Sequence, residues 1–170
     1  MKALLLVPVI ALASCGYHVS GHADLMPKTI QSVCIPAFRN ASTRYKLTDR
    51  LPEAISHEFI ARTRYHIVSN CDAADAILRG SVTNYLANQT TIDTAGTGRA
   101  TSADIHVILS INFTERATGK VLYNNASFSV NERYEISVNP IAYFEESDAA
   151  LNRVASQVSR QVVSAILEKF

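Results

Sequence analysis

The sequence predicts a two-layer α+β domain, in which two helices pack on one face of a mixed or antiparallel β-sheet in the order β-α-β-β-β-β-α. Apolar residues recur with helical spacing near each end of residues 29–170. Between these stretches, apolar and polar residues alternate as they do in strands with one buried face. A chain of 170 residues, 48% of them hydrophobic and 18% charged, can bury one core, so we expect a single domain.

The first strand and the first helix are expected within residues 29–62. Residues 29–38 have the composition of a strand, and Pro36 should lie near its end or at an edge because proline donates no ladder hydrogen bond. The helix should begin at an N-cap, Thr48, and end near residue 62. Its apolar stripe consists of residues four apart: Leu47, Leu51, Ile55 and Phe59.

Four more strands and a second helix should follow. We expect the strands at residues 65–68, 76–87, 104–114 and 121–134, with a polar loop over 88–101 and a turn over 117–120. In the second of these strands, Leu78, Val82 and Leu86 should lie on one side, opposite Arg79, Ser81 and Thr83. The apolar phase of the last strand shifts, which indicates a β-bulge near Asn124 and Asn125. The final helix should run from about residue 146 to residue 169.

The N-terminal residues have the parts of a secretory signal: basic Lys2, an apolar run over residues 3–13 and small residues before Cys15. The run is too short to span a bilayer, which takes about 20 helical residues. Leu12-Ala13-Ser14-Cys15 resembles the bacterial lipobox, so we expect removal of residues 1–14 and acylation of Cys15. Residues 15–28 then form a lipidated tether. A plain secretory signal with an incidental cysteine, or a buried strand, are the alternatives.

Two further cysteines, Cys34 and Cys71, leave two readings open. In an oxidising compartment they can form a disulfide, and they can equally remain two separate buried thiols.

The sequence gives little support for catalysis, metal binding or nucleic-acid binding. The net charge is +1, without the basic patch that nucleic acid requires. None of the five histidines falls in a metal-ligand cluster, and no nucleophile motif or cofactor motif is present. We expect Asp72 and Asp75 to solvate a loop, and the acidic residues over 145–148 to cap the last helix. A periplasmic hydrolase would require these carboxylates to cluster with histidines.

Several motifs in order resemble the LptE family of lipopolysaccharide-assembly lipoproteins. Cys15-Gly16-Tyr17-His18 follows the lipobox as in that family, and residues 35–40 (Ile-Pro-Ala-Phe-Arg-Asn) resemble its first strand. The helix over residues 51–59 comes at the matching place. Residues 74–80 (Ala-Asp-Ala-Ile-Leu-Arg-Gly) resemble the family's entry to the next strand.

The resemblance implies a protein that is not an enzyme and has no cofactor or metal. It would plug and support the outer-membrane β-barrel LptD in lipopolysaccharide transport, anchored on the periplasmic side of the outer membrane. Gly16 agrees, since an aspartate there would favour inner-membrane retention in enterobacterial-type sorting. Basic residues would contact lipopolysaccharide, unless they are merely solvated surface charges; the candidates are Arg79, Arg99, Arg116, Lys120 and Arg133. An alternative of another class is a lipid-anchored module for a small ligand or lipid, which predicts an apolar pocket between helices and sheet.

Overall fold

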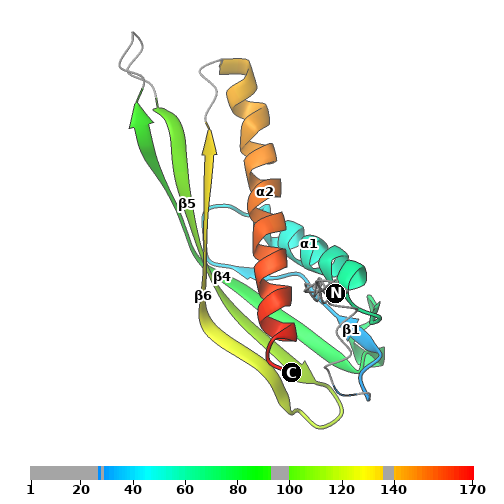
Figure 1. The fold of residues 1–170 in the computed structure, drawn as a ribbon. Helices are drawn as coiled ribbons and strands as arrows, with labels where there is room; N and C mark the ends of the chain where they lie inside the picture. Colours follow the sequence, from blue (N-terminus) through cyan, green and yellow to red (C-terminus); the bar gives the residue numbers. More distant parts are fainter. Residues whose placement is uncertain (1–26, 28, 93–99, 136–139) are drawn as a thin grey trace, which may run out of the picture.

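The computed structural model describes residue 27 and residues 29–92, 100–135 and 140–170 (Figure 1). The expected signal segment, Cys15 and nearly all of the expected tether lie outside these residues, as does Arg99.

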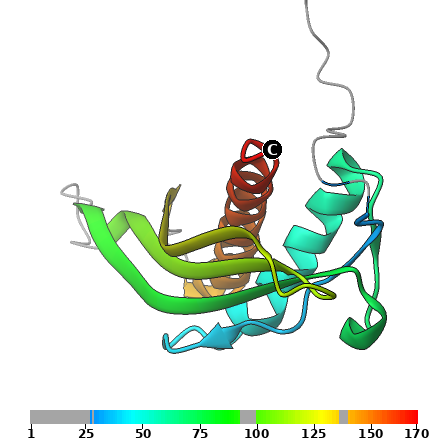
Figure 2. The ribbon, with the colours of Figure 1, turned by 90° about the horizontal axis from the view of Figure 1, so that it is seen from below.

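Two helices cover one face of a curved six-stranded sheet, which confirms the predicted α+β class (Figure 2). The elements follow the chain as β1 (Ser32–Cys34), β2 (Arg39–Asn40), α1 (Leu47–Arg62), β3 (His66–Ile67), the short 3-10 helix η1 (Cys71–Ala73), β4 (Ala76–Ile92), β5 (Ala100–Glu115), β6 (Val121–Glu135) and α2 (Pro140–Leu167). The order across the sheet is β3-β1-β4-β5-β6, and β2 also pairs with β4. The sheet is mixed, because β1 pairs in parallel with β3 and β4, and β2 pairs in parallel with β4, whereas β4, β5 and β6 are antiparallel.

The expected first strand is two short strands, β1 and β2, that pair with β4 at separate points. Val33 is aligned with Ala76, and Arg39 is aligned with Ser81. Pro36 lies in the break between the two strands, where its missing N–H group interrupts no ladder.

Helix α1 has the predicted apolar stripe, with Leu47, Leu51, Ile55 and Phe59 completely buried. The predicted N-cap at Thr48 is wrong. The backbone already turns at residues 44–47, where the Leu47 N–H donates to the Arg44 carbonyl at 3.0 Å, so Thr48 lies inside the first turn.

Strands β4, β5 and β6 form a long antiparallel ribbon, and β4 and β5 extend into the expected loop over residues 88–101. A register shift between Val82 and Asn84 reverses the faces of β4 beyond it. Leu86 therefore lies on the solvent side, 49% exposed, and the prediction that it shares a side with Leu78 and Val82 is wrong. The bulge in β6 falls between Asn125 and Phe128, next to its predicted place.

Helix α2 begins at Pro140, earlier than predicted, and proline is well tolerated at the first helical position. Asp148 consequently lies within the helix and not at its N-terminus. Its carboxylate accepts from the Lys46 Nζ at 2.7 Å and lies 3.2 Å from the Arg50 guanidinium, so it joins α2 to α1. The Lys46 hydrogen bond lowers the pKa of Asp148.

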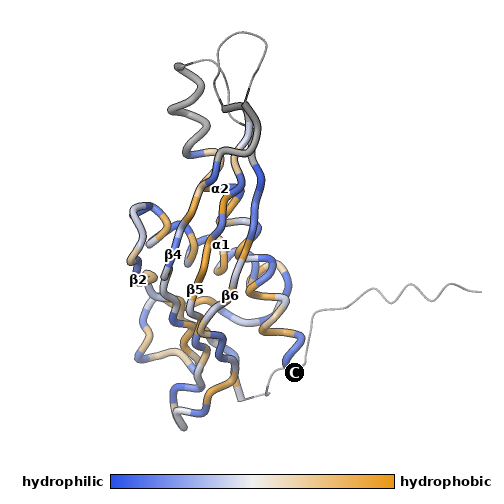
Figure 3. The backbone as a smooth tube through the Cα atoms, turned by 90° about the vertical axis from the view of Figure 1, so that its left-hand side faces the viewer, coloured by the Kyte–Doolittle hydropathy of each residue, from blue (hydrophilic) through white to orange (hydrophobic). Residues whose placement is uncertain are grey.

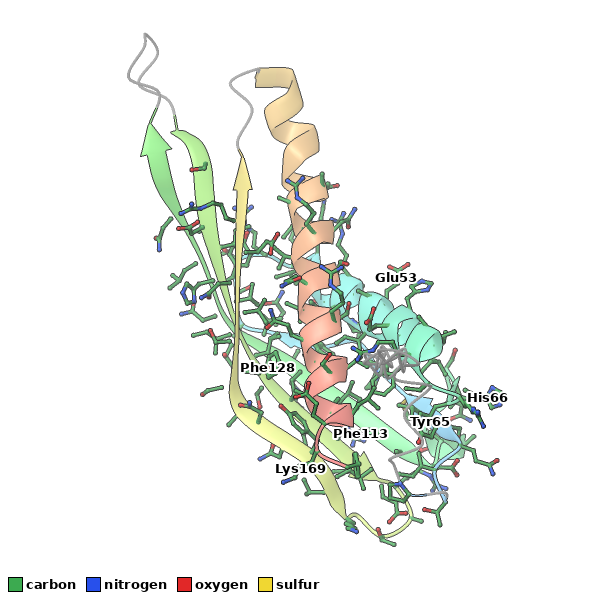
Figure 4. The ribbon with its side chains drawn as sticks, viewed as in Figure 1. Glu53, Tyr65, His66, Phe113, Phe128 and Lys169 are labelled. Carbon is green, nitrogen blue, oxygen red and sulfur yellow. A yellow bond between two sulfur atoms is a disulfide. The ribbon has the colours of Figure 1, made fainter. Side chains whose placement is uncertain are left out.

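The core fills the space between the helices and the sheet. Phe59 of α1 contacts Phe113 of β5 with ring centroids 6.2 Å apart, and Phe128 of β6 packs against the same core beside α2 (Figure 4). Glu53 and His66 point away from the core in the same view. Among the described residues, neither helix combines the length and apolar character needed to cross a membrane.

Candidate functional site

The two helices leave one face of the sheet uncovered, the face turned away from them, which is here called the outer face (Figure 3). Alternate residues of β4, β5 and β6 form it in cross-strand rows. The rows are Arg79–Asn112–Asn124, Asn84–Ile108–Ser129 and Leu86–His106–Asn131. Most of these side chains are polar and uncharged, so the face offers hydrogen bonds with little net charge.

An ion pair between β5 and β6 lies on the outer face, near the end of the ribbon opposite the β5–β6 turn. The Arg133 Nε donates to Asp104 Oδ1 at 2.7 Å, and Nη2 donates to Oδ2 at 3.2 Å. These hydrogen bonds lower the pKa of Asp104 and raise that of Arg133, so both stay charged and neutralise each other.

Of the basic residues predicted to contact lipopolysaccharide, the four that the structure describes do not form one cluster. Arg79 lies on the outer face, whereas Arg133 sits in the ion pair with Asp104. Arg116 is used structurally, because its Nε donates to the Ala74 carbonyl at 2.6 Å. Lys120 is exposed in the β5–β6 turn, at the opposite end of the ribbon from Arg133.

Sequence reasoning missed Arg39, which the fold brings to Arg79. Both arginines line a shallow hollow of about 410 Å³ at the β2 edge of the outer face. Its other lining residues are Pro36, Ala37, Gly80, Ser81, Ser110 and Asn112. The position of Arg39 follows from the register of β2 on β4. The sequence motif around Arg39 does not reveal that register.

Phe38 and Gly80 fix the backbone beneath this hollow. Phe38 is 2% exposed, and a Cβ atom at Gly80 would lie 2.2 Å from its ring. Only glycine leaves room for the ring against β4 at this position. This contact holds β2 beside β4 and so sets where Arg39 lies relative to Arg79.

Asp75 ties β1 to the start of β4, and the expectation that it solvates a loop is wrong. Its Oδ2 accepts from the backbone N–H groups of Gln31 and Ser32, both at 2.9 Å, and from the Ser32 hydroxyl at 2.8 Å. These hydrogen bonds, led by that of Gln31, lower the pKa of Asp75. Cys34 and Cys71 are joined by a disulfide beside this network, with their Cα atoms 5.1 Å apart.

The alternative functions differ in the cavity or cluster that they require. No group of three metal-ligating side chains occurs in the part of the chain that the structure describes. Besides the Arg39–Arg79 hollow, one hollow of about 330 Å³ lies between α2 and β6 and another of about 210 Å³ lies at the start of α1. All three are at the surface, and none is the apolar interlayer pocket that a small-ligand module predicts.

Comparison with known proteins identifies the family. The family model LptE, described as lipopolysaccharide-assembly, matches residues 30–166. The chain belongs to the LptE family. This membership confirms the resemblance that the motifs indicated, and it supports a role in lipopolysaccharide assembly. The family is one of lipoproteins that are not enzymes.

Solved structures share the fold at low sequence identity. Rare lipoprotein B from Shewanella oneidensis is 9% identical, with a TM-score of 0.53 over 81% of this chain and 94% of its own. A lipoprotein from Caulobacter crescentus is 12% identical, with a TM-score of 0.53 over 77% and 88%. Protein XCC0632 from Xanthomonas campestris is 16% identical, with a TM-score of 0.53 over 85% and 90%. Among curated proteins, no sequence matches this LptE-family chain.

Proposed function

We propose that this LptE-family chain is an outer-membrane lipoprotein that plugs and supports an LptD-type β-barrel in lipopolysaccharide transport. Acyl chains on Cys15 hold it on the periplasmic side of that membrane. Two or more acyl chains anchor a protein stably, since each buried methylene contributes about 0.8 kcal/mol. The anchor also keeps the domain near its partner at high effective concentration.

The outer face is the observation that carries the barrel partnership. The interior of an outer-membrane barrel is polar, so a domain that fills it needs a surface of hydrogen-bonding groups with little net charge. Rows such as Asn84–Ile108–Ser129 and the neutralised Asp104–Arg133 pair provide such a surface.

Affinity purification of the tagged full chain from detergent-solubilised outer membranes tests the partnership. We expect an LptD-type barrel, identified by mass spectrometry, in about equal molar amount. Recovery of the chain without such a barrel would overturn the proposal.

A pair of tryptophan variants tests whether the outer face makes the contact. Ser129→Trp adds bulk to the middle of the outer face, and Asn152→Trp adds the same bulk to the exposed side of α2. We expect Ser129→Trp to reduce barrel recovery several-fold and Asn152→Trp to retain it, with both variants unfolding at the wild-type temperature. Equal barrel recovery with the two variants would show that the outer face does not make the contact with the barrel.

Two adjacent substitutions test the anchor. Cys15→Ala should release the chain from the membrane fraction, because no thiol remains to be acylated. Gly16→Asp should keep the chain acylated but move it to the inner membrane in a host with enterobacterial-type sorting. Unchanged fractionation of Cys15→Ala would show that the cysteine is not the anchor.

A further inference from the structure

We propose that residues 17–25, which precede the described domain, add to the sheet as a further strand on the free edge of β6. Their apolar side chains enter the hollow between β6 and α2, and their polar side chains continue the outer face. This inference goes beyond the barrel partnership and does not depend on it, because the edge and its occupant both belong to this chain.

The two edges of the sheet differ in length. Strand β3, at one edge, has 2 residues, whereas β6, at the other, has 15. Of the described strands, only β5 pairs with β6. Along the other side of β6, alternate residues therefore present backbone N–H and carbonyl groups that no described strand pairs with. Such a row of groups is a template for one more strand.

Strand β6 lacks most of the features that keep an exposed edge from pairing. Natural edges are commonly protected by lysine, proline or other charged residues. Strand β6 contains neither lysine nor proline, and residues 121–131 contain no charged side chain. One bulge, between Asn125 and Phe128, is the exception. The composition of this edge therefore favours a permanent occupant over exposure to water.

The two sides of β6 require different side chains from an added strand. On the side toward α2, Phe128 and Ala165 contribute to the lining of the hollow of about 330 Å³. Phe128 is only half-buried there, although it packs against the core beside α2 (Figure 4). On the other side, the exposed side chains are polar: Asn124, Ser129 and Asn131. A matching strand has apolar side chains toward α2 and polar side chains toward the outer face.

Residues 17–25 have this alternation. The apolar residues are Tyr17, Val19, Ala23 and Leu25, with Gly21 in the same row, and the polar residues between them are His18, Ser20, His22 and Asp24. A period of two over this length is typical of a strand with one buried face. The segment thus has the pattern that the two sides of β6 require.

The described domain begins close to the point where β6 begins. The Thr29 hydroxyl donates to Glu115 Oε1 at 3.4 Å, and the Glu115 N–H donates to the Lys120 carbonyl at 2.9 Å. Thr29 therefore lies beside the β5–β6 turn, which leads into Val121. A chain that arrives at Thr29 along β6 runs from the far end of the ribbon toward this turn, which makes its pairing with β6 antiparallel.

The length of the segment suits this path. At about 3.4 Å per residue, residues 17–25 extend over about 30 Å, which is roughly two thirds of the length of β6. Residues 26–28 remain to cross from the edge to Thr29. Cys15 then lies toward the end of the ribbon that holds the Asp104–Arg133 ion pair. If Cys15 is acylated as proposed above, that end of the domain faces the membrane.

Hydrogen exchange of the detergent-solubilised full chain, purified away from other envelope proteins, tests the pairing. The variant V19E/L25E places two charges on the side toward α2, and S20E/H22E places two charges on the solvent side as a matched control. We expect the amides of residues 121–131 to exchange about tenfold faster in V19E/L25E than in wild type, and within about twofold of wild type in S20E/H22E. Equal exchange in V19E/L25E and wild type overturns the proposal.

Photo-cross-linking provides a second measurement that does not depend on disrupting the segment. Val19→p-benzoylphenylalanine should cross-link to β6 or to residues 157–168 of α2, with the sites identified by mass spectrometry. Ser20→p-benzoylphenylalanine is the control, since its side chain points to the outer face and should not reach α2. Absence of cross-links from position 19 to β6 and α2 overturns the proposal.

A mixture of isotope-labelled and unlabelled chains identifies the occupant of the edge. Cross-links that join two labelled or two unlabelled peptides support pairing within one chain. Cross-links that join a labelled peptide to an unlabelled one show that a second copy occupies the edge, and they overturn the proposal. Barrel recovery with V19E/L25E is measured separately, so that failure of the strand pairing and failure of the barrel partnership are distinguished.

Discussion

Asp75 and Ser32 bind each other through reciprocal hydrogen bonds that hold β1 against β4. The Ser32 backbone N–H and hydroxyl both donate to Asp75 Oδ2, while the Asp75 backbone N–H donates to the Ser32 carbonyl at 3.1 Å. Strand β1 has only three residues, so this exchange adds to the few ladder hydrogen bonds that join it to β3 and β4. Hydrogen bonds that involve a carboxylate are stronger than those between neutral groups.

Replacement of Asp75 should weaken the domain and change its response to acid. We expect Asp75→Ala to lower the free energy of unfolding by about 1–3 kcal/mol at pH 7, because it leaves the donors of Gln31 and Ser32 without their charged acceptor. The pKa of Asp75 is lowered in the folded state. Its contribution is therefore present above the pKa of the unfolded chain and is lost as pH falls through the lower folded value.

Urea unfolding at neutral and acidic pH measures this effect. Wild type should lose more stability than Asp75→Asn as pH falls below about 5, since the variant has no carboxylate to protonate. Asp72→Asn is the control, because Asp72 lies in the adjacent 3-10 helix and its side chain is exposed. Parallel acid profiles of wild type and Asp75→Asn would contradict the prediction.

Gly80 should tolerate no side chain while Phe38 is present. A Cβ atom at residue 80 would overlap the buried ring, and overpacking of a core costs about 1–3 kcal/mol. We expect Gly80→Ala to lower the unfolding free energy by that amount. Phe38→Leu leaves more room beside β4, so the double variant should be less destabilised than the sum of the two single variants. Strict additivity in thermal or urea unfolding would show that the two residues do not compete for space.

The Cys34–Cys71 disulfide should be a large contributor to stability. It closes a loop with a sequence separation of 37 residues, for which loop-closure entropy gives about 3–4 kcal/mol. We expect the variant with both cysteines replaced by alanine to unfold at lower urea concentration by an amount that matches this loss. Wild type treated with dithiothreitol should unfold like that variant. If dithiothreitol leaves the urea unfolding of the wild type unchanged, and Cys34 and Cys71 both react as free thiols without it, the disulfide is excluded.

Side-chain periodicity predicted both helices and the three long strands, although not all of their bounds. The stripe from Leu47 to Phe59 and the alternation from Ile105 to Phe113 identify α1 and β5, because burial of one face imposes the spacing directly. Periodicity failed where a single extra residue changes the phase, as between Val82 and Asn84, which turns Leu86 outward. Such bulges depend on the neighbouring strand and leave little mark on one sequence.

Less of the candidate site than of the fold could be predicted from the sequence. Arg79 was identified as a basic residue in a strand, but its partner Arg39 depends on the parallel pairing of β2 with β4. The motif residues around it have structural roles. Phe38 packs on Gly80, and Asn40 Oδ1 accepts from the Ser42 N–H at 2.8 Å and thereby shapes the loop before α1.

Arg116 should behave as a structural residue, unlike its neighbour Lys120 in the same turn. The Arg116 side chain donates to the Ala74 carbonyl, and its backbone N–H donates to the Asp75 carbonyl at 2.7 Å, so it fastens the β5–β6 turn to the start of β4. We expect Arg116→Ala to lower the unfolding free energy by about 1–2 kcal/mol, because a charged donor is lost. Lys120→Ala, at an exposed position, should stay within about 0.5 kcal/mol of wild type. Urea unfolding of the two variants checks this, and binding to lipid A vesicles separates stability from ligand contact. If Arg116→Ala unfolds like wild type but binds lipid A vesicles more weakly, Arg116 contacts the ligand and the structural role is wrong.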